Sequence, residues 1–150
     1  MSTDLWRFAQ RLYAQPGVED ACLQLQAEGQ DVCLLLCCAW LERHGVPCGV
    51  EYLETLQAVA EPWQEEVIRP LRQLRQHWRA PALDDPSLGQ LREQVKQLEL
   101  AAEQQLLQRL DAVSRTWGKE SVTPLGGSWL HNLKGNRDAL ELVRVAAAAV

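Results

Sequence analysis

The sequence lacks several features that would assign it to a common functional class at once. It contains no apolar run of the ~20 residues that a membrane-spanning helix needs, and its first residues lack the basic and apolar stretches of a secretory signal. Alternation of apolar and polar residues, which is typical of β-strands, is confined to a few residues at a time. A glycine-rich phosphate loop is also missing, because Gly126-Gly127 stands alone with no strand before it. We therefore expect a cytoplasmic protein that is built without strands and does not associate with membranes.

An excess of positive charge is absent as well. The chain has 15 basic and 20 acidic residues, which gives a net charge of −5. General nucleic-acid binding normally needs an overall basic field, so such a role is disfavoured unless a local basic patch serves it. Glycine and proline, at nine and seven residues, are too scarce for a disordered chain of this apolar content. A length of 150 residues suits one domain, which we expect to span residues 1–150.

The cysteines lack the spacing of a metal or redox motif. The five of them are Cys22, Cys33, Cys37, Cys38 and Cys48, and no Cys-x-x-Cys occurs. Three lie in an apolar run, where a free thiol behaves as a small hydrophobic side chain. We expect all five to be reduced, as in a reducing cytosol, with Cys48 the most accessible because it follows a proline in a loop.

What the sequence does contain is a nearly uninterrupted apolar run from Asp31 to Trp40. Ten such residues exposed to water would aggregate, so the run is expected to form the centre of the fold. The side chains predicted to be largely buried are Val32, Leu35, Leu36, Ala39 and Trp40.

Helical spacing of apolar residues continues along most of the chain, which predicts an all-α, single-domain helical bundle of about six to seven helices. Thr3 or Asp4, Asp31, Ser128 and Asn136 are placed to cap helices. Pro62 is expected to begin a new helix and Pro70 to kink or break it. The other expected elements are helices at about 18–26, 32–44 and 50–60, one long helix at about 88–117, and a flexible segment at about 118–127.

Four arginines form the most suggestive surface. Arg69, Arg72, Arg75 and Arg79 span an arc of about 120° on the helix that follows Pro62, opposite its stripe of tryptophan, leucine and valine. Arginine favours bidentate contact with carboxylates and phosphates. The alternative interpretation of these four residues is an ordinary solvated face.

Two acidic residues on the long helix are a second candidate. Glu99 and Glu103 are one turn apart, a spacing that can serve acid–base chemistry, bind a metal or form a buried polar site. Lys96 is three residues before Glu99, so local ion pairing explains part of the pattern. We expect Leu98 and Ala102 to be core positions, which places both glutamates at the boundary facing another helix, near Arg72 or Arg7.

Cys33, Cys37, Trp40 and His44 share one helical face, yet Cys37 and His44 lie about 10 Å apart along the axis. One zinc ion needs all its ligands within about 2.3 Å. Core packing is therefore the preferred interpretation of these residues, and we expect neither a metal nor another cofactor.

A set of short motifs resembles a known family. The motifs occur in this order: Leu5-Trp6-Arg7-Phe8-Ala9, Leu12-Tyr13, Pro16-Gly17-Val18, Asp31-Val32, Leu34-Leu35-Leu36, Trp40, Pro70-Leu71-Arg72, Lys96, Glu99-Leu100 and Glu103. Together they resemble a family of short proteobacterial proteins of unknown function, DUF2390, over roughly residues 4 to 115. Where the family pattern has Asn after Asp-Val, this chain has Cys33. The resemblance implies a bacterial cytoplasmic origin and a helical fold, and it implies no particular activity.

These observations favour a non-enzymatic interaction or adaptor protein whose arginines dock an acidic or phosphate-bearing partner, most simply a protein. No catalytic constellation passes a spacing test. Two alternatives remain: a small bundle enzyme or redox or metal protein that uses Glu99 and Glu103 or the cysteines, and a nucleic-acid-associated factor.

Overall fold

Helices make up nearly all regular structure in the residues that this computed structural model describes, 4–118 and 122–150. The α-helices are α1 (Asp4–Tyr13), α2 (Val18–Ala27), α3 (Val32–Arg43), α4 (Val50–Trp63), α5 (Arg69–His77), α6 (Pro86–Ser114) and α7 (Arg137–Ala148). A π-helical segment covers Gln64–Ile68, and 3₁₀ turns cover Pro81–Asp84 and Leu130–Asn132. The predicted all-α fold with one long helix is confirmed. Within the described ranges, no helix combines the length and apolar character needed to cross a bilayer.

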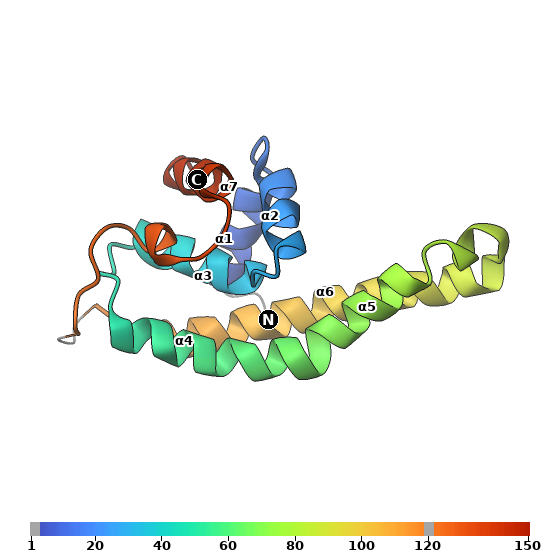
Figure 1. The fold of residues 1–150 in the computed structure, drawn as a ribbon. Helices are drawn as coiled ribbons and strands as arrows, with labels where there is room; N and C mark the ends of the chain where they lie inside the picture. Colours follow the sequence, from blue (N-terminus) through green and yellow to red (C-terminus); the bar gives the residue numbers. More distant parts are fainter. Residues whose placement is uncertain (1–3, 119–121) are drawn as a thin grey trace.

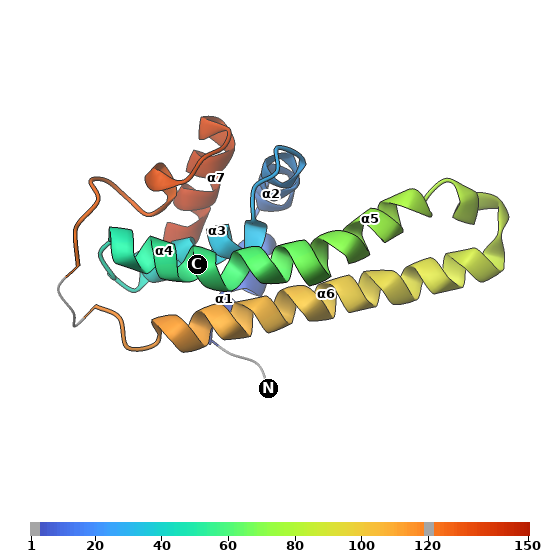
Figure 2. The same ribbon diagram turned by 60° about the horizontal axis from the view of Figure 1, so that its bottom comes forward.

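The helices are arranged as a long hairpin with a smaller cluster on one side (Figure 1). The rod formed by α4, the π segment and α5 lies alongside α6, as the view of Figure 2 also shows. Helices α1, α2, α3 and α7 gather over the part of this hairpin that contains α4 and the C-terminal half of α6. The other part projects beyond the cluster, and we call it the arm, residues 69–98.

The predicted apolar run forms the centre of the core. Eight residues of α3 are buried, among them Leu35, Leu36, Ala39 and Trp40 as expected. Val32 is only partly buried, because it lines a cavity at the start of the helix. Helix α3 packs against α1, α2, α4, α6 and α7, which explains why the run has no polar face.

Side-chain caps fix several helix starts where the sequence predicts them. The Asp31 carboxylate accepts a hydrogen bond from the Leu34 amide at 3.0 Å, and the Asn136 side chain accepts one from Ala139 at 3.0 Å. Asp85 caps α6, with Pro86 in its first turn. The long helix therefore begins two residues before the expected position 88, and it ends at Ser114 rather than at 117. Thr3 lies outside the described residues.

The expectation for Pro62 was wrong, because α4 continues through this residue to Trp63. The interruption expected at Pro70 is present, because the helix widens into the π segment just before it, but the rod does not end there. A proline ring clashes with the carbonyl four residues earlier, here that of Glu66, and a wider turn relieves the clash. The rod thus stays continuous from α4 into α5 (Figure 2).

The segment expected to be flexible, 118–127, is only partly described, since residues 119–121 lie outside the described ranges. Its second half forms backbone hydrogen bonds with the start of α4 and the residues before it. The Val50 amide donates to the Thr123 carbonyl at 3.1 Å, and the Leu125 amide donates to the Cys48 carbonyl at 3.0 Å. Gly49 permits this approach, because a Cβ atom there would lie 2.6 Å from a methyl group of Val122. Trp129 then enters the core with 1% of its surface exposed.

Candidate functional site

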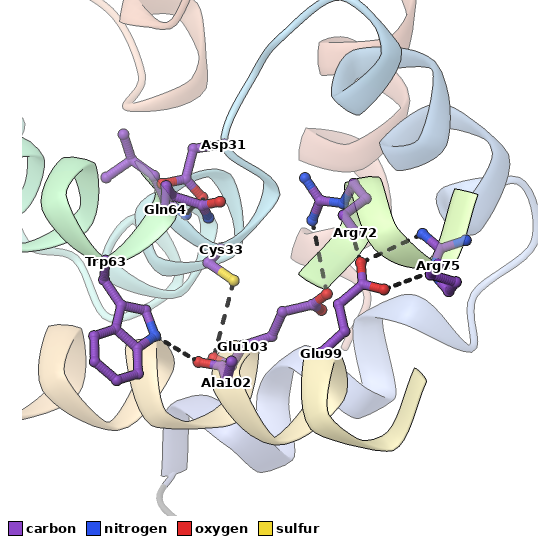
Figure 3. A network of polar contacts seen from close by, with 10 residues as sticks. Asp31, Cys33, Trp63, Gln64, Arg72, Arg75, Glu99, Ala102 and Glu103 are labelled. Atoms are coloured by element: carbon purple, nitrogen blue, oxygen red, sulfur yellow. Dashed lines mark hydrogen bonds and ion pairs between the residues drawn. The ribbon is translucent and has the colours of Figure 1, made fainter. Parts of the chain in front are cut away.

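A buried ion-pair cluster joins α5 to α6. Glu99 is only 6% exposed. One of its carboxylate oxygens accepts a hydrogen bond from Arg72 Nε at 3.1 Å, and the other accepts one from Arg75 Nε at 2.5 Å (Figure 3). Leu98, predicted to be a core residue, is 57% exposed, so that expectation was wrong. Pairing with two arginines compensates the burial of a carboxylate, and the helix accordingly turns Glu99 rather than Leu98 towards α5.

Glu103 lies one turn further along α6 at the edge of the same cluster. Arg72 Nη2 is 3.7 Å from its carboxylate, a longer contact than either contact to Glu99. Burial, followed by the negative charge of Glu99, raises the pKa of Glu103 from 4.5 to about 7. The expectation that both glutamates face another helix near Arg72 is confirmed.

A second set of polar contacts links this cluster to α3 and α4 (Figure 3). The Asp31 carboxylate accepts a hydrogen bond from Gln64 Nε2 at 2.8 Å, while burial raises the pKa of Asp31. The Cys33 thiol donates to the Glu103 carbonyl at 3.9 Å, and Trp63 Nε1 donates to the carbonyl of Ala102 at 2.8 Å. The helix start at Asp31, the π segment and the middle of α6 are thereby fixed relative to one another.

The four predicted arginines do not form one exposed face. Arg72 and Arg75 point at α6, with 16% and 23% of their side chains exposed. Arg69 pairs with Glu65 on the same rod, and Arg79 is exposed. The cause is the rotation of the rod, which turns one edge of the predicted arc towards the glutamates of α6.

A basic groove nevertheless exists on the arm. It has a volume of about 600 Å³, and its four cationic lining residues are Arg75 from α5, Arg79 just after the end of α5, and Arg92 and Lys96 from α6. Arg92 Nε donates to the Arg75 carbonyl at 2.9 Å, which fixes the two helices at this point. Lys96 pairs with Glu93, whereas no carboxylate of the described residues pairs with Arg79 or Arg92. We use the name basic groove for these four residues.

The five thiols form no disulfide, and all of them are buried. Cys48, at 5% exposure, is the most exposed of the five, as predicted, although it too is buried. Backbone pairing with Leu125 and a contact from Asn132 cover it. Burial raises the pKa of Cys22 to about 12 and raises those of the others as well, which makes all of them poor nucleophiles. Within 4–118 and 122–150, no three His, Cys, Asp or Glu side chains come together as a metal site requires.

Fold and cluster together define an all-α protein in which buried arginine–glutamate pairs anchor a projecting two-helix arm. The chain belongs to the family described as "Protein of unknown function (DUF2390)", whose pattern matches residues 4–110. No curated protein and no solved structure matches the chain. The match includes the ion-pair cluster and the basic groove, and it excludes Trp129.

The raised pKa of Glu103 has a measurable consequence for stability. The Glu103 carboxyl group holds its proton more tightly in the native protein than in the unfolded chain. Its protonation therefore contributes fully to the free energy of unfolding below pH 4.5, and this contribution is lost as the pH rises through about 7. Glutamine imitates the protonated form. We compare the free energy of unfolding of Glu103→Gln with that of wild type at each pH. This difference is expected to favour the variant by on the order of 1–2 kcal/mol more at pH 8 than at pH 5, after allowance for partial solvent exposure.

Urea unfolding of both proteins at the two pH values measures this difference. Glu93→Gln is the matched control, since Glu93 lies on the same helix with 62% of its side chain exposed. A stability difference between Glu103→Gln and wild type that is the same at both pH values would contradict the assignment.

Proposed function

We propose that this protein is a non-enzymatic adaptor that docks an acidic protein partner in the basic groove of the arm. The observation that carries the proposal is the convergence of four cationic side chains from α5, the turn after it and α6 in an otherwise acidic molecule. Like charges placed together repel, so a groove of this kind is stabilised by an anionic occupant. The partner, rather than the protein itself, is proposed to supply that charge.

The charges of the basic groove are only partly compensated from within. Arg75 shares the carboxylate of Glu99 with Arg72, and Lys96 pairs with the exposed Glu93. Arg79 and Arg92 are left for a partner, and the guanidinium group binds a carboxylate in a bidentate manner. An acidic segment lying in the groove would satisfy both.

Exposed leucines favour a protein over a nucleic acid. Leu74, Leu91 and Leu98 on the arm are all exposed. At 100° per residue, Leu91 and Leu98 lie about 140–160° around α6 from Lys96, so the arm has an apolar edge as well as a basic one. Apolar side chains add affinity for a protein surface, and the net charge of −5 repels a phosphate backbone.

The enzymatic alternative has weaker support. Both oxygens of Glu99 are engaged by arginines, and the thiols are buried and protonated. We also propose a cytoplasmic location, because five thiols that form no disulfide suit a reducing compartment.

Charge reversal in the basic groove tests the proposal. Arg79→Glu combined with Lys96→Glu leaves the Arg72, Arg75 and Glu99 contacts in place and is expected to weaken association with an acidic peptide by about tenfold or more. Binding of the wild-type protein should weaken as salt shortens the ~10 Å screening length of 0.1 M solution. Titration of purified protein with a fluorescent peptide of alternating Glu and Leu residues measures both effects.

Lys134→Glu combined with Arg137→Glu is the matched control, because it changes the charge equally at two exposed residues outside the basic groove. Equal loss in both double variants would show a general charge effect and contradict the groove assignment. Tighter binding of a single-stranded oligonucleotide than of the peptide would favour the nucleic-acid alternative.

A further inference from the structure

A cavity between α1, α3 and α6 is separate from the basic groove. Its volume is about 590 Å³, within the range that suits a small organic molecule. Most of its wall is apolar, and the residues that matter here are Trp6, Tyr13, Val32, Leu36, Leu100 and Leu107. Two aromatic rings and four aliphatic side chains thus surround a space open to solvent on one side.

The polar part of the wall carries an unbalanced negative charge. Glu103 lines the cavity, and it belongs to a cluster with the carboxylates of Asp31 and Glu99. Among the residues that the structure describes, two guanidinium groups, those of Arg72 and Arg75, face these three carboxylates. Both arginines contact Glu99 closely, whereas the contact of Arg72 to Glu103 is 3.7 Å. The excess charge therefore falls at the wall of the cavity.

We propose that this cavity binds a small organic ammonium ion with an aromatic or branched apolar body. The ammonium group pairs with the Glu103 carboxylate, and the apolar body packs on the surrounding side chains. Trp6 and Tyr13 add an attraction between a cation and an aromatic ring. This site is additional to the proposed docking of a protein on the arm, since none of the four residues of the basic groove lines the cavity.

Binding of a cation at this site competes with a proton on Glu103. The groups that face Glu103 are Tyr13 from α1, Asp31 and Cys33 at the start of α3, Arg72 and Arg75 from α5, and Glu99 on α6. Tyr13, with a pKa raised to about 12, and Cys33, with a raised pKa, stay protonated near neutral pH. An alkylammonium ion, like a lysine side chain with its pKa of ~10.4, stays charged there too. Ionisation of Glu103, at about pH 7, therefore controls the affinity.

Isothermal titration calorimetry of the full chain with 2-phenylethylammonium tests the proposal. The neutral analogue 2-phenylethanol and the anion 3-phenylpropionate have nearly the same apolar body. At pH 8 the ammonium ion is expected to bind about tenfold tighter than the alcohol, and its affinity to fall about tenfold between pH 8 and pH 6. Glu103→Gln should abolish both the preference and the pH dependence, whereas Glu93→Gln should keep them.

A second variant separates loss of the site from loss of the fold. Ala14 lines the cavity yet is exposed, so Ala14→Phe fills the space without disturbing the core, and it is expected to abolish binding of the ammonium ion. Far-UV circular dichroism checks that the variant is folded. Absence of ammonium binding at pH 8, equal or tighter binding of the alcohol or the anion, or unchanged binding by folded Ala14→Phe would each overturn the proposal.

Discussion

Replacing Trp129 by alanine is expected to lower the free energy of unfolding by about 3–5 kcal/mol. Trp129 is 1% exposed, its Nε1 donates to the Val46 carbonyl at 2.7 Å, and its ring lies parallel to that of Tyr52. Alanine removes the ring and leaves both a cavity and a partly buried carbonyl without its donor. The residue lies beyond the region that matches the family, so the effect would show that the C-terminal segment is part of the same core.

Urea unfolding followed by circular dichroism measures this loss. Trp78→Ala is the control, because Trp78 is only partly buried at the end of α5 and its truncation should have a much smaller effect. Equal effects of the two substitutions would mean that Trp129 does not hold the segment on the core.

Glu99→Gln is expected to destabilise the protein by about 2–4 kcal/mol, since a charged pair broken on one side leaves its partners without compensation. Two guanidinium groups lose their shared carboxylate in this variant, and both are largely shielded from water. Their residual exposure of 16% and 23% reduces the loss below that of a fully buried pair. The amide offers one acceptor oxygen in place of two, places an NH₂ donor opposite a guanidinium group, and carries no charge.

A compensating variant makes this test sharper. Replacing Arg72 and Arg75 by methionine and Glu99 by leucine in one chain removes all three charges together, and it is expected to recover most of the stability that Glu99→Gln loses. Glu93→Gln again serves as the control for loss of an exposed charge. Stability of Glu99→Gln equal to that of wild type would show that the ion pairs contribute nothing to holding α5 on α6.

Local chemistry explains which parts of the fold the sequence could predict. The caps Asp31 and Asn136 are local, because each acts on an amide three residues away, and the helices they begin were predicted correctly. Pro62 misled for the opposite reason: a proline normally interrupts a helix, yet packing against α6 keeps α4 continuous through this residue. The interruption expected at Pro70 is present as the π segment just before it.

The rotation of the long helix about its axis likewise depends on packing and could not be predicted from local sequence. Periodicity marks Leu98 as a core position, yet this residue is exposed while Glu99 is buried. Only the arginines of a separate helix make a buried carboxylate acceptable there, and their position depends on the hairpin. Arg92 and Lys96 were missed as groove residues for this reason, since the pairing of α5 with α6 brings them beside Arg79.

Hydrogen–deuterium exchange of the protein with and without an acidic protein recovered by co-purification tests the proposed function most directly. Docking in the basic groove is expected to slow amide exchange in α5 and in the first half of α6, within residues 69–98, and to leave α1, α2 and α7 unchanged. Protection confined to α1, α2 and α7, with exchange in the arm unaltered, would contradict the proposal that the arm is the docking surface.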